Sequence, residues 1–390
     1  MLLENEKIDF NREVLMKREY SDEEINNKYI DGEVRIVTEQ ARYPLDTIPA
    51  MLNSGKYKLD PDYQRRRRWS NEKMSRLIES FIMNVPIPPI FLYEDEFSHY
   101  EVMDGLQRLT TIKDYYEDKY ALEGLTLWSE LNGKKYSELP EKVRMGIDRR
   151  YISSIVLLQE SAKNSKEALR MKQMVFERIN SGGVKLEPQE TRNALYNGKM
   201  NQKCIKLSEN EYLRMFLGIS DDKKEDNDYY KKMTDVEYVL RFFAMRQLEG
   251  YAGKRLYEFL DEYLIKSNNF SDVLLEQMGN IFDETIKLAY DLLGEKAFKM
   301  YRVRKTRDES ENWNWYNRTT TTIYDPLMQV LANNLHRKEQ LIQKKEMIAD
   351  KIANFYMENY ENFEGRNSNK ADVEKRVYLF QNFFDEIIGE

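Results

Sequence analysis

The sequence predicts an α+β domain followed by a mainly α-helical domain. Its 390 residues are enough for more than one hydrophobic core. Short strand-like runs occur only in the first half of the chain, whereas the second half has helical spacing of apolar residues almost throughout. With only 16 glycines and 9 prolines, few long loops are expected. We therefore expect a helical N-terminal arm over residues 1–33, the α+β domain over 34–200 and the helical domain over 201–390.

Short apolar runs bounded by turn residues predict the strands of the α+β domain. They lie at residues 34–38, 57–59, 90–93, 100–103 and 154–158. Between the second and third of these runs, Ser70 is a good N-cap for a helix whose apolar residues, from Met74 to Ile82, line one face. The prolines of residues 85–89 end that helix and keep the backbone extended into the next strand.

Two further helices are expected near the end of this domain. The first covers residues 166–179 and is followed by Gly182 and Gly183, which suit a left-handed C-cap. Pro188 then fits the first position of the next helix, which runs to Tyr196.

Beyond residue 200 the apolar spacing predicts helices. They cover residues 236–248, 256–264, 273–293, 326–335, 341–360 and 373–388. The charged residues 221–230 are expected to form a surface loop. The aromatic and polar stretch 313–318 is expected to pack between helices rather than to stack on bases.

The composition limits the function. The 61 basic and 68 acidic residues give a net charge of −7, which argues against a uniformly cationic nucleic-acid surface but allows local basic patches. Cys204 is the single cysteine and there are two histidines, so disulfides and zinc sites are poorly supported. No long apolar run and no signal-peptide pattern is recognised, so we expect a cytoplasmic protein without membrane contact.

The segment from Asp104 to Thr111, with the sequence DGLQRLTT, combines a strand end, a glycine and a polar helix start. Such a turn favours an anion, because backbone N–H groups and the helix dipole point at it. Arg108 adds a guanidinium that can hold a phosphate with two hydrogen bonds. Judged alone, the segment is explained better by an ordinary strand–helix turn with an aspartate cap.

A run of arginines forms a second candidate. It consists of Tyr63, Gln64, Arg65, Arg66, Arg67, Arg68 and Trp69. Arginines among aromatic residues suit phosphates and stacked bases, although such a run also fits a solvated surface. In extended backbone alternate side chains point to opposite sides, so at most two of the arginines reach one site.

A third candidate joins the end of one predicted helix to the start of the next. Its polar and glycine residues are Arg178, Asn180, Ser181, Gly182, Gly183, Glu190, Arg192 and Asn193. Helix caps explain the glycines, but they leave the crowding of polar residues unexplained. Such a loop can also form an anion-binding nest.

Taken in this order, the three candidates resemble the ParB/sulfiredoxin-like N-terminal domain of GmrSD-type, modification-dependent restriction systems. The proline step at residues 87–90 also looks like that family, and the likeness covers about residues 35–200. The resemblance implies an α+β fold that binds a nucleoside triphosphate and acts in defence against phage or foreign DNA. It also implies a nuclease or modification-system partner protein and, in some members, nucleotide hydrolysis.

The resemblance also implies roles for residues of this chain. Asp104, Gln107 and Arg108 are the expected catalytic residues, with Asp104 as a ligand of Mg²⁺ and Gln107 orienting water or a phosphate oxygen. The expected nucleotide or phosphate ligands are Tyr63, Gln64, Arg65, Gly105, Thr110, Thr111, Arg178, Asn180, Ser181, Gly182, Gly183, Arg192 and Asn193. Arg66, Arg67 and Arg68 are the expected DNA contacts.

This chain departs from the family in two places. Leu106 stands where the family usually has a second glutamine, so a polar contact is lost and binding is favoured over catalysis. The second half has only His336, which argues against the HNH nuclease domain of many relatives. Two alternatives therefore stay open: a DNA-binding or DNA-nicking protein that grips the backbone through its arginine-rich loops, and a catalytically silent interaction protein.

Overall fold

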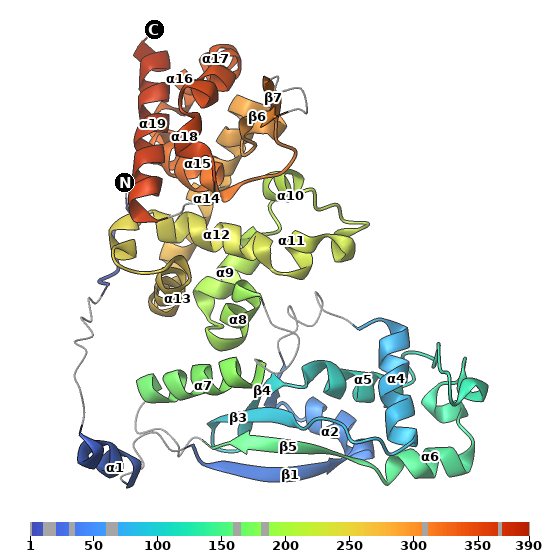
Figure 1. Cartoon of the computed structure of the whole chain (residues 1–390). Coiled ribbons are helices and arrows are strands. Elements are labelled where there is room, and N and C mark those ends of the chain that lie inside the picture. The colour runs from blue at the N-terminus through green and yellow to red at the C-terminus, as the bar shows by residue number, and fades with distance from the viewer. Residues whose placement is uncertain are drawn as a thin grey trace. The chain divides into compact units, whose positions relative to one another are not determined.

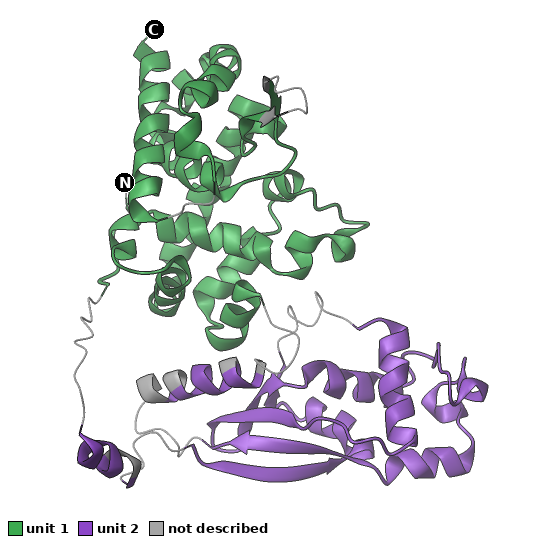
Figure 2. Ribbon diagram, viewed as in Figure 1, with its two compact units in different colours: residues 1–13, 187–390 green, residues 14–186 purple. Residues whose placement is uncertain are grey.

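A computed structural model describes residues 2–10, 21–30, 36–59, 69–158, 165–180, 187–305, 311–365 and 369–389. The chain forms two compact units (Figure 2). The sheet unit is Val14–Leu186, and the helical unit combines Met1–Glu13 with Glu187–Glu390. The α+β and helical halves predicted from the sequence are therefore present. The units divide before the helix that starts at Pro188, whereas the sequence suggested a boundary near residue 200.

The sheet unit is built on a five-stranded mixed sheet in the order β1-β5-β3-β4-β2 (Figure 1). The strands are β1 (Thr38–Pro44), β2 (Tyr57–Lys58), β3 (Ile90–Glu96), β4 (His99–Asp104) and β5 (Tyr151–Leu157). β3 pairs antiparallel with β4 and parallel with β5, and the edge strand β1 pairs antiparallel with β5. The prediction was accurate to a few residues for β2 to β5. It misplaced β1, which overlaps the predicted run only at Thr38, because a mostly exposed edge strand carries little apolar alternation.

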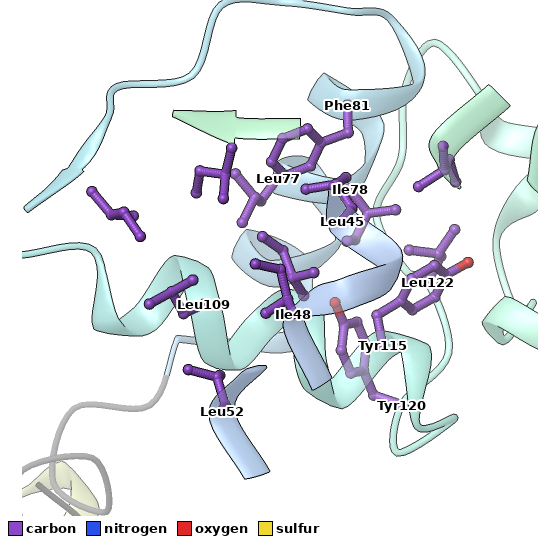
Figure 3. Close-up of a cluster of buried hydrophobic side chains, with 14 of the residues drawn as sticks. Leu45, Ile48, Leu52, Leu77, Ile78, Phe81, Leu109, Tyr115, Tyr120 and Leu122 are labelled. Carbon is purple, nitrogen blue, oxygen red and sulfur yellow. The ribbon is translucent and has the colours of Figure 1, made fainter. Parts of the chain in front are cut away.

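Helices cover one face of this sheet and enclose its hydrophobic core. They are α2 (Ile48–Asn53), α4 (Asn71–Ile82), α5 (Leu106–Tyr116) and α6 (Glu141–Asp148). Figure 3 shows how Leu77, Ile78 and Phe81 of α4 meet Leu109 of α5 and Ile48 of α2 in this core. As expected, the Ser70 hydroxyl caps α4 by accepting from the N–H of Lys73. The packing of α5 against α2 and α4 fixes where its first turn lies.

The opposite face of the sheet receives α7 (Ser165–Asn180), which contacts β4. Lys172 of α7 lies 2.6 Å from the Glu101 carboxylate of β4, and its ammonium lies 5.7 Å from the ring centre of Tyr93. Residues 93 and 101 alternate with core residues such as Leu92, so they point away from the core. α1 (Asp22–Ile30) also belongs to this unit and accounts for part of the predicted N-terminal arm.

The helical unit contains the following helices. They are α8 (Pro188–Leu195), α9 (Lys199–Leu207), α10 (Glu211–Leu217), α11 (Asp228–Lys231), α12 (Thr234–Met245), α13 (Leu256–Ser267), α14 (Asp272–Leu293), α15 (Thr321–Asn333), α16 (Lys338–Gln343), α17 (Lys345–Glu358), α18 (Tyr360–Phe363) and α19 (Lys370–Gly389). Pro188 opens α8 as predicted. The predicted helix 341–360 is divided at Lys344 and Asn359 into α16, α17 and α18. None of the helices in the described part of the chain is both long and apolar enough to cross a membrane.

Three further parts of the helical unit differ from the sequence prediction. Residues 221–230 were expected to form a surface loop, but they include a 3₁₀ turn, Lys224–Asp226, and most of α11. Residues 301–315 include an antiparallel hairpin, β6 (Tyr301–Lys305) with β7 (Glu311–Trp315), which was not predicted, although the rings of Trp313 and Trp315 pack against helices as expected. Residues 2–10 contain no helix, whereas a helical arm was predicted. The buried carboxylate of Glu6 instead accepts hydrogen bonds of 2.6 and 2.8 Å from Arg246, just after α12. This contact joins residues 240 positions apart, which no local pattern records.

Candidate functional site

The sharp turn between β4 and α5 requires glycine at position 105. Gly105 has φ of +95°, a conformation that residues with a Cβ rarely adopt. A Cβ atom there would lie 2.4 Å from Cγ2 of Ile90 and 3.0 Å from a guanidinium nitrogen of Arg108. Both the backbone angle and the close contact of Ile90 and Arg108 therefore exclude a side chain at position 105.

The first turn of α5 has no side-chain cap. The helix bonds begin with the N–H of Leu109, which donates to the Gly105 carbonyl at 3.0 Å. The preceding N–H groups of Leu106, Gln107 and Arg108 therefore point out of the helix start, where the helix dipole is positive. Asp104 does not cap the helix, so the ordinary aspartate-capped turn that the sequence also allowed is not what forms.

Asp104 instead accepts a hydrogen bond from Arg108. A terminal guanidinium nitrogen of Arg108 lies 2.8 Å from the Asp104 carboxylate and 3.2 Å from the Pro89 carbonyl. The Arg108 side chain is 13% exposed and that of Asp104 is 41% exposed, so the arginine is fixed while the carboxylate reaches solvent. This arrangement orients the guanidinium at the helix start before any ligand arrives.

Two donors at this turn are left over. Gln107 Nε2 and Arg108 Nε are buried and have no hydrogen-bond partner among the described residues. Burying a donor without a partner costs about 1–3 kcal/mol, so native proteins rarely do it without a reason. Adjacent unsatisfied donors beside an uncapped helix start indicate a site for an acceptor, and phosphate oxygens are acceptors of the right charge.

The other predicted residues of this motif have structural contacts. The Thr110 hydroxyl lies 2.8 Å from the Leu106 carbonyl, to which it donates, and Thr111 is buried. Both threonines lie one turn further along α5 than the helix start. Leu106 is also buried, so the side chain at the position that departs from the family packs in the interior.

The predicted residues between Arg178 and Asn193 are divided between the two units. Arg178 is exposed on the last turn of α7 in the sheet unit, where Asn180 is the final residue. Arg192 belongs to α8 of the helical unit and is buried there, donating to Asp261 at 2.7 Å and to Glu237 at 2.8 Å. The Asn193 side chain accepts from Asn201 at 2.7 Å. The Arg192 charge is thus balanced inside the helical unit, so this guanidinium is not left available for a phosphate.

Several predicted residues lie outside the described part of the chain. They are Tyr63, Gln64, Arg65, Arg66, Arg67, Arg68, Ser181, Gly182 and Gly183. Their roles stay predictions.

The contribution of Pro89 and Ile90 to the site was not predicted from the sequence. The Pro89 carbonyl accepts from Arg108, and Ile90 closes the space beside Gly105. Both follow from the register, since Phe91 pairs with Asp104 across β3 and β4. The proline step at residues 87–90 was the available signal, but it does not reveal which strand lies beside it.

The described residues contain no group of three or more potential metal-ligating histidine, cysteine, aspartate or glutamate side chains. His336 lies in a short 3₁₀ turn, Leu335–Arg337. A metal ion at the turn after β4 would therefore have Asp104 as its protein carboxylate among these residues, with the rest of its ligands from the substrate and water.

Comparison with protein-family models gave a match. Residues 48–197 match the family model described as GmrSD restriction endonuclease, N-terminal domain. The matched range covers β2 to α8 and includes the whole turn from Asp104 to Arg108. The chain therefore contains a GmrSD-type N-terminal domain, as its motifs predicted, which supports a component of a restriction system. Neither the search of curated proteins nor that of solved structures found a match.

Proposed function

We propose that this GmrSD-type domain binds a nucleoside triphosphate at the turn between β4 and α5, as the nucleotide-binding component of a restriction system. The observation that carries the proposal is the pair of buried, unpartnered donors, Gln107 Nε2 and Arg108 Nε, beside the uncapped start of α5. A phosphate group placed there accepts from these donors and from the N–H groups of the first turn.

In the proposed site, different nitrogen atoms of Arg108 have different functions. One terminal nitrogen is bonded to Asp104 and Pro89, which holds the planar group in place. The Nε remains for the ligand, so the guanidinium meets a phosphate without first losing rotational freedom. Gly105 supports this arrangement, since its positive φ and the absence of a Cβ let Ile90 and the Arg108 guanidinium pack closely against the turn.

Asp104 makes the proposed site dependent on a divalent cation. Its carboxylate lies 2.8 Å from Arg108 and neutralises part of the charge that a phosphate needs. It is also half-exposed on the same turn, so it repels an arriving triphosphate. Mg²⁺ between Asp104 and phosphate oxygens removes this repulsion, and Mg²⁺ commonly takes one or two carboxylates together with phosphate and water ligands. Binding is thus supported more directly than hydrolysis, because the described residues offer no carboxylate base at this turn besides Asp104.

The first test replaces Arg108 by alanine. We expect nucleotide affinity to fall on the order of 10- to 100-fold, because a charge-assisted hydrogen bond to an ionised group contributes about 1.5–3 kcal/mol. Isothermal titration calorimetry with ATP, GTP and CTP in the presence of Mg²⁺ measures the change. Arg76→Ala is the matched control, since Arg76 forms a comparable pair with Glu72 at 2.5 Å, but on the exposed surface of α4. The proposal is wrong if none of these nucleotides binds the unmodified protein, or if both variants bind equally well.

The second test replaces Asp104 by asparagine. Because the repulsion of the phosphate is removed, we expect nucleotide binding without Mg²⁺ to strengthen several-fold, while the gain from adding Mg²⁺ becomes smaller. Titrations with and without a chelator give both quantities. An unchanged Mg²⁺ dependence in Asp104→Asn would show that the cation is held elsewhere.

A further inference from the structure

The hairpin β6–β7 of the helical unit carries an unusual density of positive charge. From Lys296 to Arg318 the sequence has seven basic and three acidic residues, in a chain whose net charge is −7. Among the described residues, Lys299, Arg302 and Arg318 form no ion pair, and the Lys296 ammonium lies 5.3 Å from the ring centre of Trp315. By contrast, Arg241 of the same unit pairs with Asp325, and Arg337 pairs with Asp385. Lys299, Arg302 and Arg318 are therefore not balanced by a carboxylate of the described residues.

The two faces of the hairpin differ in character. Tyr301 pairs with Trp315, and Val303 pairs with Trp313, so these residues share one face. That face packs on neighbouring helices, since the Trp313 ring centre lies 5.3 Å from that of Tyr360 in α18, and the Trp315 ring centre lies 5.9 Å from that of Tyr356 in α17. These ring contacts attach β7 to the helical unit.

The other face is polar and exposed. Arg302 pairs with Asn314 in the register, and Asn312 lies on the same face two residues along β7. All three side chains are exposed, and the Arg302 guanidinium lies 3.9 Å from the ring centre of Tyr316. Asn314 Nδ2 donates to Asn312 Oδ1 at 2.8 Å, which aligns the amides along the strand and leaves donors and acceptors directed outward.

We propose that this outer face of β6–β7 binds double-stranded DNA. A two-stranded ribbon fits the major groove of B-form DNA, where arginine and asparagine are the typical partners of guanine and adenine. Arg302 on this face, with Lys299 and Arg318 close to the two strands in the sequence, supplies positive charge for the phosphates. Single strands are disfavoured, because they are held by stacking on free aromatic rings, whereas Trp313 and Trp315 are packed against tyrosines.

The proposal concerns the helical unit alone and does not depend on nucleotide binding at α5. It gives the chain a DNA contact apart from the arginine run at residues 65–68. The two assignments can be separated, because the residues that they involve belong to different units.

The test measures binding of the full chain to a fluorescein-labelled duplex of mixed sequence, without nucleotide, over a series of salt concentrations. For the double variant Arg302→Gln/Arg318→Gln we expect affinity at low salt to fall on the order of tenfold, and the slope of log affinity against log salt to decrease by about 2. Arg302→Lys/Arg318→Lys should restore the slope, because it keeps the charge. Circular dichroism establishes that the variants are folded.

Two control variants make the result specific. Arg255→Gln removes another exposed arginine of the same unit, whose side chain lies 3.4 Å from the Tyr257 hydroxyl, and is expected to leave affinity and slope unchanged. Arg108→Ala should likewise leave DNA binding unchanged while it weakens nucleotide binding. Equal losses in the Arg255 and hairpin variants, an unchanged slope in Arg302→Gln/Arg318→Gln, or tighter binding to a single-stranded probe would each overturn the proposal.

Discussion

Replacing Asp325 by alanine is expected to lower the free energy of unfolding of the helical unit by about 3–5 kcal/mol, because a buried charge loses its partner. Asp325 of α15 and Arg241 of α12 are both buried, and Arg241 Nε donates to the Asp325 carboxylate at 3.0 Å. Burial raises the pKa of Asp325 and the arginine opposes this effect, so the pair is held together against a considerable desolvation cost. Without Asp325, the nearest carboxylate to Arg241 is Glu237 at 3.7 Å.

The unfolding of the helical unit can be measured through the reactivity of the Cys204 thiol. Cys204 lies in α9 of the same unit, is fully buried, and has a pKa that burial raises, so it is protected from modification while the unit is folded. Its rate of reaction with a thiol reagent across a urea series therefore reports unfolding of this unit. Asp291→Ala removes a surface carboxylate that lies 2.6 Å from Lys287, and should cost less than about 1 kcal/mol.

A double substitution, Arg241→Met with Asp325→Leu, distinguishes the lost charge partner from a simple cavity. We expect it to be far less destabilising than Asp325→Ala, since replacing both members of a buried pair by apolar residues is often neutral. If the double variant is as unstable as the single one, packing rather than the unpaired charge explains the loss.

Replacing Gly105 by alanine is the second change with a large expected effect. The left-handed backbone costs about 1–3 kcal/mol for a residue with a Cβ, and the contact with Ile90 at 2.4 Å adds about 1–3 kcal/mol of overpacking. We expect the sheet unit to lose about 2–5 kcal/mol in total, and nucleotide binding to be lost with it, since relief of the clash displaces the start of α5. Hydrogen exchange at the amides of β4 and α5 measures the local stability, and calorimetry measures the binding.

The variant Gly133→Ala separates the cost of the left-handed backbone from the cost of overpacking against Ile90. Gly133 also has a positive φ, of +85°, but a Cβ atom added there would meet no atom within 4 Å, so only the backbone cost of about 1–3 kcal/mol applies. If both alanine variants lose the same stability, the close approach of Ile90 does not restrict position 105.

Some helices and turns could be predicted from the sequence, whereas some strands could not. Ser70 and Pro188 marked helix starts, and Gly105 marked the turn between β4 and α5, because capping and backbone angles depend on neighbouring residues. Residues 102–111 therefore carried enough information to locate the candidate site. The edge strand β1 was misplaced, because an exposed strand with few apolar residues lacks a clear alternation. The hairpin β6–β7 was not predicted, although Tyr301 and Val303 alternate with arginines, and Trp313 and Trp315 with asparagines, which is the pattern of half-buried strands.

The partners of the charged side chains were decided by the tertiary structure. Arg192 looked like a phosphate ligand in the sequence, yet it is buried against Asp261, a residue 69 positions away. Arg108 gained its second support from Pro89 only because β3 and β4 are paired. Charge balance in a folded chain depends on which distant segments meet, and residue type and spacing do not encode this. Residue types within one short segment were enough to locate the turn after β4 and to reveal the family resemblance. The pairing of β3 with β4 decided which donors of Arg108 have a partner in the protein, because it brings the Pro89 carbonyl to the guanidinium.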